Sequence, residues 1–326
     1  MGARPRSLGA LRRLLLAPRM SHVGLTHLGH PGRRSPHARL LERIPEAVVC
    51  GFEWGIEANE PQEVEHRLDA VTPELRGFAF EGVTMAYTIR DVLPLGRNDH
   101  TRRFMLGPAL PHTFLSYIGI GFAMSRLPRP LWRRIVPDLE GNPYHPTMSW
   151  LAVDGYGFDQ AYFDASRWID GQRTPDPYPW EGYPDYFLRA FDQGVGRALW
   201  FVHGALHHAV GATVECFPRP RRPDLWSGVG LAAVFAGGAE PEALHALLEL
   251  AGEDAPHVRQ GAVFAAKARV FSGQVPDHTE AAVRALTGLT PEEAAALADE
   301  CGVRRDRGGP EPAYETWRAQ VRGRFS

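Results

Sequence analysis

The chain has 326 residues, of which 44% are hydrophobic, and its 36 basic and 38 acidic residues leave a formal net charge of −2. This balance produces no field strong enough to hold a polyanion, so we expect no nucleic-acid partner. Cys50, Cys216 and Cys301 share no disulfide or metal-binding spacing, which favours a reduced, cytoplasmic protein. Lys267 is the only lysine, and such arginine usage indicates a high-GC bacterial genome.

Residues 1–38 are rich in Arg, Gly and His, and we predict that they form an N-terminal arm. The apolar run near Leu14 is shorter than the ~7–15 residues of a signal peptide, so we expect it to stay on the mature protein. No stretch approaches the ~20 apolar residues that span a membrane. A surface helix is the first expectation for this segment, and an amphipathic contact with a membrane is the alternative.

A two-glycine signature recurs along the rest of the chain. Its best copies, of the form X-Gly-x-Gly, lie at 118–121, 154–157, 193–196 and 227–230, and single glycines at 51, 82 and 261 extend the series. Self-similarity at a period of ~35 residues is typical of stacked helical pairs. We therefore predict an all-α fold in which residues 39–300 form six to seven tandem helical pairs, as an α-solenoid or a closed α/α ring. Residues 301–326 are predicted to be a mobile C-terminal tail.

Prolines and loop residues mark the expected helix boundaries. A proline at the first helical position needs no N–H donor, so the prolines before the glycines predict helix starts. These are Pro45, Pro73, Pro111, Pro146, Pro184, Pro223 and Pro256. A more polar second helix, such as 240–251, is expected to close most units. Clustered Pro, Gly, Trp and Tyr predict long ordered loops at 129–146 and 171–184.

Glycine inside a helix requires an explanation, because each one costs about 1 kcal/mol relative to alanine. One explanation is close approach of neighbouring helix backbones, and the other is a ligand-sized space in front of the glycines. Under the first explanation, Gly196→Leu should overpack the contact, whereas Gly196→Ala should cost little or even help.

Charged and aromatic residues beside the glycines supply the candidate site. Helical spacing places Arg189, Asp192, Gln193, Gly196, Trp200 and His203 on one face of the helix that follows Pro184. The candidate acid, base or orienting groups are Asp154, Asp159, Asp192 and Arg197. The alternative is that Arg189 or Arg197 forms a buried ion pair with an aspartate, since an unpaired buried charge is costly. Candidate substrate-binding residues are Glu81, Tyr156, Tyr162, Gln193, Trp200, His203, Trp226 and Gln260.

Known cofactor motifs do not fit this chain. His203-x-x-x-His207 has helical spacing for a metal but no evident third ligand. Gly228-x-Gly-x-x-Ala233 follows no strand, so it is not a dinucleotide fingerprint. We therefore expect neither a metal nor another cofactor.

Five phrases together resemble one actinobacterial family, domain of unknown function 1702, whose members are often labelled enediyne biosynthesis proteins. They are the segments at 76–82, 154–163, 192–201, 226–233 and 260–269, and the resemblance covers residues 8–300. It implies a soluble protein of polyketide-type secondary metabolism, with polyketide synthases or accessory enzymes as potential partners. The family typically has His where this chain has Asp159, so no role carries over to that position.

The functional expectation is a biosynthetic protein that binds a hydrophobic, polyene-like intermediate and assists its cyclisation or modification. A non-catalytic helical-repeat scaffold for biosynthetic enzymes is the first alternative, and an isoprenoid (terpene) cyclase without the usual metal motifs is the second. An enclosed cluster of aromatic and carboxylate groups would favour an enzyme, whereas exposed aromatics on an open concave surface would favour a scaffold.

Overall fold

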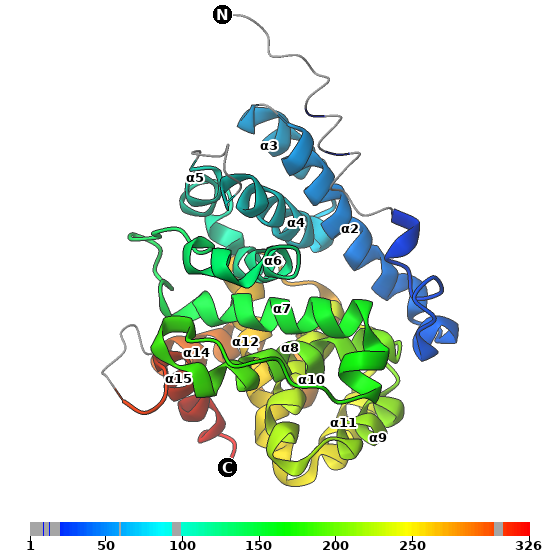
Figure 1. Cartoon of the computed structure of the whole chain (residues 1–326). Coiled ribbons are helices and arrows are strands. Elements are labelled where there is room, and N and C mark those ends of the chain that lie inside the picture. Colours follow the sequence, from blue (N-terminus) through cyan, green and yellow to red (C-terminus); the bar gives the residue numbers. More distant parts are fainter. Residues whose placement is uncertain (1–8, 10–12, 14–19, 59, 93–98, 303–308) are drawn as a thin grey trace, which may run out of the picture.

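The computed structural model describes residues 9, 13, 20–58, 60–92, 99–302 and 309–326. Most of these residues are helical and none of them lies in a strand, which confirms the predicted all-α fold (Figure 1).

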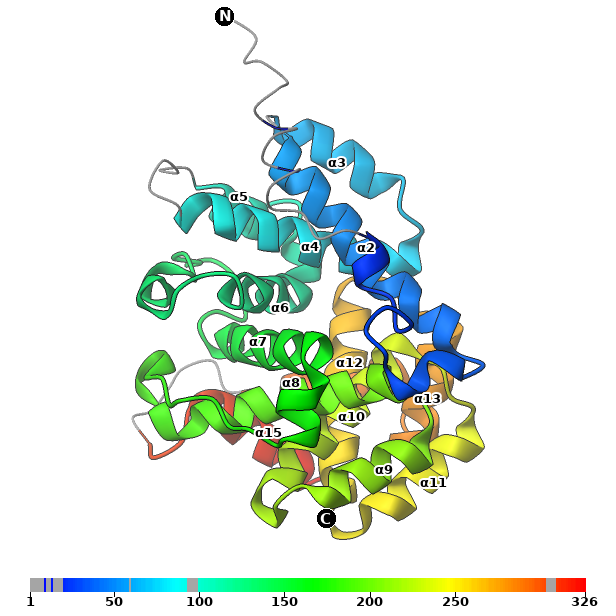
Figure 2. The same ribbon diagram turned by 45° about the vertical axis from the view of Figure 1, so that its right-hand side comes forward.

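Within the described ranges, seven helices carry the glycine signature, and each packs against the next in chain order (Figures 1 and 2). They are α2 (Ala38–Glu57), α4 (Pro73–Val92), α6 (Thr113–Met124), α7 (Trp150–Phe163), α8 (Phe187–Val202), α10 (Arg222–Ala236) and α12 (Ala255–Phe271). The row curls on itself, since Phe78 of α4 packs edge-on against Phe235 of α10 with ring centroids 5.4 Å apart. Arg269 of α12 also donates to the backbone oxygen of Glu74 at 3.1 Å.

Shorter helices connect most members of this row. The further α-helices are α3 (Pro61–Asp69), α5 (His100–Leu106), α9 (His207–Cys216), α11 (Pro241–Ala251), α13 (Asp277–Thr287), α14 (Pro291–Glu300) and α15 (Ala313–Arg322). Short 3₁₀ turns lie at Met20–His22, Pro31–Arg34, Leu110–His112, Arg129–Arg134, Thr147–Ser149, Trp180–Gly182, Pro184–Tyr186, Arg219–Arg221 and Gly252–Asp254, and a π turn lies at Ser166–Asp170. The α6–α7 and α7–α8 connections contain only such turns, so the predicted loops are confirmed and these two units lack a second α-helix.

The spacing of the two glycines places them on opposite sides of their helix. Two residues correspond to about 200° of rotation, so one glycine meets the preceding helix and the other meets the following one. In α6, a Cβ added to Gly119 would overlap the backbone of Glu81, and one added to Gly121 would overlap the backbone of Ala152. The same arrangement recurs in α7, α8 and α10. Close helix packing is therefore the correct explanation of the glycines, and the alternative that they face a ligand is wrong.

This geometry also overturns the expected tolerance of Gly196→Ala. A Cβ at Gly196 would overlap the backbone oxygen of Leu225 in α10, and backbone cannot rotate away as a side chain can. Even a methyl group at Gly196 should therefore push the two helices apart.

The predicted helix starts are confirmed at Pro73, Pro223 and Pro256, which lie in the first turns of α4, α10 and α12. The prediction was wrong for Pro45, which lies inside α2. The first turn of α2 instead begins at Ala38, with His37 as its N-cap residue.

Both end segments of the described chain pack against the helical row. In the arm, Val23 and Leu25 are buried, and Tyr162 of α7 donates its hydroxyl hydrogen to the Val23 oxygen at 2.7 Å. Within the segment expected to be a mobile tail, residues 313–322 form α15, whose Trp317 and Arg318 are buried. The expectation of mobility was therefore wrong for α15.

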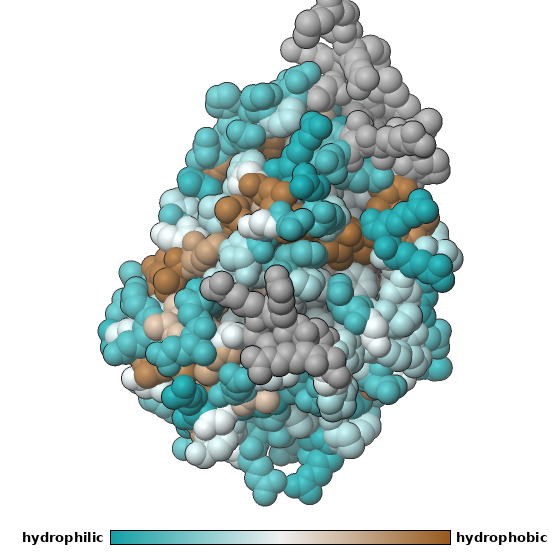
Figure 3. Space-filling model, turned by 90° about the vertical axis from the view of Figure 1, so that its left-hand side faces the viewer, coloured by the Kyte–Doolittle hydropathy of each residue, from teal (hydrophilic) through white to brown (hydrophobic). Residues whose placement is uncertain are grey.

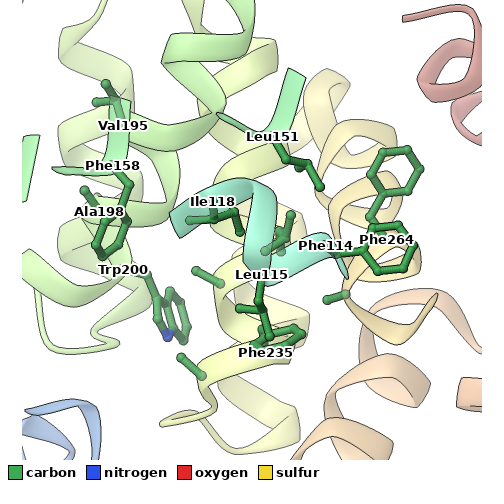
Figure 4. Close-up of a cluster of buried hydrophobic side chains, with 14 of the residues drawn as sticks. Phe114, Leu115, Ile118, Leu151, Phe158, Val195, Ala198, Trp200, Phe235 and Phe264 are labelled. Carbon is green, nitrogen blue, oxygen red and sulfur yellow. The ribbon is translucent and has the colours of Figure 1, made fainter. Parts of the chain in front are cut away.

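The hydrophobic core lies inside the curled row. Figure 4 shows side chains from several glycine helices meeting there, among them Phe114 and Ile118 of α6, Leu151 of α7, Phe235 of α10 and Phe264 of α12. The interior of the curl is thus lined by the helices that the glycines hold together.

Candidate functional site

Two positions of the glycine motif build the inner wall of the curl. The residue before the first glycine and the residue after the second are four apart, so they share one face of the helix. In chain order these pairs are Glu81 and Met85, Ile118 and Phe122, Asp154 and Phe158, Gln193 and Arg197, Ser227 and Leu231, and Gln260 and Phe264. Of these residues, Glu81, Met85, Ile118, Phe122, Phe158, Arg197, Leu231 and Phe264 line the two cavities described next, whereas Asp154, Gln193, Ser227 and Gln260 line neither.

Two adjoining cavities, which we call the lumen, lie against this wall. The first has a volume of about 50 Å³, and its lining includes Phe114, Phe201, Phe235, Phe264, Lys267 and Trp317. The second has a volume of about 60 Å³, and its lining includes Glu81, Phe122, Arg126, Phe158, Asp159 and Tyr162. Phe78, Arg197 and Phe201 border both cavities. Each cavity is smaller than the ~150 Å³ space that admits benzene, so a longer ligand requires these shared side chains to rotate.

Removing one shared side chain should join the two cavities. We expect Phe201→Ala to lower the free energy of unfolding by about 3–5 kcal/mol and to create a space that takes up a small apolar molecule such as toluene. Melting curves with and without toluene measure both effects. Phe217→Ala is the control, because Phe217 is also buried but borders neither cavity. Equal stabilisation of both variants by toluene would contradict a continuous lumen.

Glu81 is the most unusual group in the lumen. Its side chain is 2% exposed, and its Oε1 has no hydrogen-bond partner among the described residues. Burial raises the pKa of Glu81 to about 8, because desolvation of the carboxylate outweighs the attraction of Arg197. At neutral pH this group is therefore mainly a protonated carboxylic acid in an apolar, aromatic space.

The pKa of Glu81 predicts a pH dependence of stability. The pKa is higher in the folded chain, so the stabilisation by the bound proton is complete below about pH 4.5 and is lost as the pH rises through about 8. Relative to Glu81→Gln, which is neutral at every pH, the wild type should lose up to about 1.4 kcal/mol per pH unit across this window. Urea unfolding of both proteins from pH 5 to pH 8.5 measures the difference. Parallel stability curves would show that Glu81 ionises normally.

Arg197 stands between the two cavities and is neutralised by Asp154. Its Nη1 donates to Asp154 Oδ1, and its guanidinium lies 4.9 Å from the centre of the Phe158 ring. Gln193 donates to Asp154 Oδ2 at 2.6 Å and to the Tyr314 hydroxyl at 2.9 Å. The ion-pair alternative therefore describes Asp154 and Arg197 correctly.

A row of hydrogen-bonding side chains links α7, α8, α10 and α12. Ser227 lies 3.2 Å from both the Gln193 and the Gln260 side-chain oxygens, and Arg318 donates to Gln260 at 3.2 Å. We call Asp154, Gln193, Ser227 and Gln260 the inner polar row, because all four occupy the position before the first glycine. Ile118 occupies that position in α6, so it separates Glu81 from the row.

Asp159 and Tyr162 border the second cavity. Asp159 accepts two hydrogen bonds from Arg126, at 2.9 and 3.1 Å. Burial raises the pKa of Asp159 despite the opposing charge of Arg126. Of the predicted site residues, Glu81, Asp159, Tyr162 and Arg197 thus meet at the lumen.

The structure places the other predicted residues away from the lumen. Asp192 accepts hydrogen bonds from Arg221 at 2.8 and 2.5 Å, so its partner is neither Arg189 nor Arg197. Burial raises the pKa of Asp192 to about 6, against the effect of Arg221. The charged stripe of α8 faces α10 and the turn before it, since Arg189 donates to Asp224 at 3.0 Å. This stripe is a helix interface and not a cavity wall.

Four aromatic or imidazole candidates also lie outside the two cavities. Trp200 donates to the Gly237 oxygen at 2.8 Å, and His203 Nε2 lies 2.9 Å from the Thr213 hydroxyl. Tyr156 packs against Trp132 and Phe191, and Trp226 is buried in α10. In the described ranges no three His, Cys, Asp or Glu side chains are grouped to hold a metal ion.

Sequence reasoning missed Phe78 and Phe201, which border both cavities, and Ser227 and Tyr314, which take part in the hydrogen bonds of the inner polar row. Aligning the glycine motifs and reading the position before the first glycine would have found Ser227. Tyr314 gives no such signal, because it reaches the row from α15, which lies outside the repeats.

Comparison with known proteins gives one match. A protein-family model described as "Protein of unknown function (DUF1702)" matches residues 7–325. Neither the curated proteins nor the solved structures contain a significant match. Among the described residues, no helix is both long and apolar enough to cross a membrane.

Proposed function

From the premise that the chain belongs to the DUF1702 family, whose function is unknown, we propose that it binds a linear unsaturated hydrocarbon chain in its lumen and promotes the cyclisation of that chain. The observation that carries this proposal is the burial of Glu81, an acid that faces an aromatic cavity and whose Oε1 has no hydrogen-bond partner in the described part of the chain. An intermediate of polyketide-type secondary metabolism is the substrate that the family resemblance favours.

The proposed reaction begins with proton transfer from Glu81. Its O–H bond breaks, the π electrons of a substrate double bond form the new C–H bond, and a carbocation remains on the adjacent carbon. A second double bond attacks that carbon and closes a ring, and loss of a proton to the Glu81 carboxylate regenerates the acid. A general acid with a pKa near the working pH suits such a step.

The surroundings of Glu81 suit a transient cation. Phe122, Phe158 and Phe201 present aromatic rings to the lumen, and ring faces attract cations. Arg197 and Arg126 would otherwise repel a carbocation, but each is paired with an aspartate. In this proposal Asp154 and Asp159 are positioning groups that neutralise these arginines, and Asp192 takes no part.

The distribution of aromatic residues favours this proposal over a scaffold. Only Met20, Phe163 and Leu250 are exposed large hydrophobic residues in the described part of the chain. On the face drawn in Figure 3, apolar residues reach the surface in separate patches among polar ones. The proposal includes the cyclisation of an isoprenoid, because an isoprenoid chain also has carbon–carbon double bonds that Glu81 could protonate.

The test compares wild type with Glu81→Gln in the producing organism. We expect the variant to fold and to retain the uncyclised chain, whereas the wild type releases product. Cyclisation does not change mass, so retention time and ultraviolet absorption of the extracted ligand are the readouts. Full production by a folded Glu81→Gln protein would overturn the proposed chemistry.

A further inference from the structure

Lys267 is the chain's only lysine, and it lies at one end of the lumen on α12. The chain has 36 Lys and Arg residues in total, so the other 35 are arginines. An ammonium group differs from a guanidinium because it is a compact charge with three freely oriented hydrogens. A lysine at this one position is therefore consistent with a small acceptor that a planar guanidinium would not match.

The surroundings of Lys267 change from apolar to polar across its side chain. On one side it lines the first cavity beside Phe264 and Ala268. On the other side its Nζ lies 2.7 Å from Asp299 Oδ2 and 5.6 Å from the centre of the Tyr144 ring. Asp299 and Tyr144 line a third cavity, of about 310 Å³, which we call the vestibule. Trp317 borders both the vestibule and the first cavity.

Asp299 can be replaced by another carboxylate as the partner of Lys267. The Lys267 side chain is 8% exposed, whereas that of Asp299 is 56% exposed. The aspartate can therefore turn into water, but the ammonium cannot leave the boundary of the lumen without losing its burial. Another carboxylate that enters from the vestibule can replace it and keep the buried charge neutral.

We infer that Lys267 binds the carboxylate head of a linear acyl chain whose apolar part lies in the lumen. This inference rests on the proposed function, since it assumes that the lumen holds the chain. It also sets the direction of the ligand: the head lies at Lys267, the chain passes Arg197 and Phe201, and the far end reaches Glu81. Glu81 then protonates the ligand at a position far from the carboxylate head of the ligand. Burial lowers the pKa of Lys267, but Asp299 and Tyr144 raise it by more, so the group stays an ammonium ion.

The test uses parinaric acid, a linear tetraene fatty acid that fluoresces in apolar surroundings, and its methyl ester. We expect Lys267→Met to weaken binding of the acid at least about tenfold, the effect of losing one hydrogen bond to a charged group, and to leave the ester unchanged. Asp299→Asn should strengthen binding of the acid, because it removes the competing carboxylate. Arg219→Met is the control. It also replaces a paired cation by methionine, but the ion pair of Arg219 with Glu253 is exposed and borders none of the three cavities.

The outcomes separate the two proposals. If acid and ester bind wild type equally, and Lys267→Met and Asp299→Asn change neither, the head-group site is wrong but the lumen remains a binding site. If neither compound binds the folded wild type, the proposed function fails, and the inference fails with it. A circular dichroism melt of each variant shows that binding was measured on folded protein.

Discussion

Gly194→Ala should destabilise the protein by about 3 kcal/mol, although alanine is the better helix former. A Cβ at Gly194 would overlap the Asp154 oxygen and lie 2.6 Å from the Phe158 nitrogen, both of which are backbone atoms of α7. Relief requires α8 to move away from α7, which also separates Gln193 from Asp154. Urea unfolding of the variant measures the loss.

Gly211→Ala is the matched control for this substitution. Gly211 also lies within a helix, α9, but its added Cβ would meet only the side chain of Leu250, which is 40% exposed and can move. This variant should be neutral or more stable by up to about 1 kcal/mol, from helix propensity alone. Similar unfolding energies for the two variants would show that backbone contact does not explain the glycine pairs.

Arg318→Met should cost about 3–5 kcal/mol, because it removes the fully buried cation between Glu315 and Asp224 and leaves these two buried carboxylates with only the partly exposed Arg189 and Arg322 as partners. Arg318 is fully buried, and its Nη1 lies 2.8 Å from oxygens of both Glu315 and Asp224. Burial alone would raise the pKa of Glu315, but Arg318, Arg189 and Arg322 lower it to about 2. Because the lowered pKa of Glu315 stabilises the wild type above about pH 4.5 and this stabilisation is lost on acidification, the difference in stability between wild type and variant should narrow as the pH falls, and thermal melts from pH 3 to pH 7 measure both effects.

The control is Arg284→Met, which removes an exposed ion pair with Glu280. Such pairs contribute about 0.3–0.5 kcal/mol, so its melting temperature should barely change. If Arg318→Met behaved in the same way, α15 would not be anchored by its charges.

The helical row could be predicted from the sequence because its cause is local. The glycine spacing specifies helices and their packing on two sides, and this spacing can be recognised from the repeat period in the sequence alone. The curl is different, since contacts such as Phe78 with Phe235 join residues that no short pattern relates. The burial of α15 was missed for the same reason, because its amphipathic sequence follows a Gly- and Arg-rich stretch that is typical of a tail.

The candidate site was predicted only in part because charge type does not reveal charge pairing. Asp154, Asp159 and Asp192 are equally acidic in the sequence, yet each has its own arginine in the fold. Glu81 stands out only in the structure, because its distinguishing feature is that no described residue forms a hydrogen bond with its Oε1. A search for unpaired carboxyls needs coordinates, whereas a search for inward positions needs only the aligned glycine motifs.

The two-sided glycine contact restricts how the length of this chain can vary. One residue inserted in α7 before Asp154 would turn the rest of the helix by about 100° relative to its start. Both glycines would then leave their neighbours, and Asp154 would turn away from Gln193 and Arg197. Insertions and deletions should therefore be tolerated in the connections, such as 125–146, and rejected within the glycine helices. A change of one residue in the length of a glycine helix therefore disrupts its packing on both sides, whereas a change in loop length leaves that packing intact.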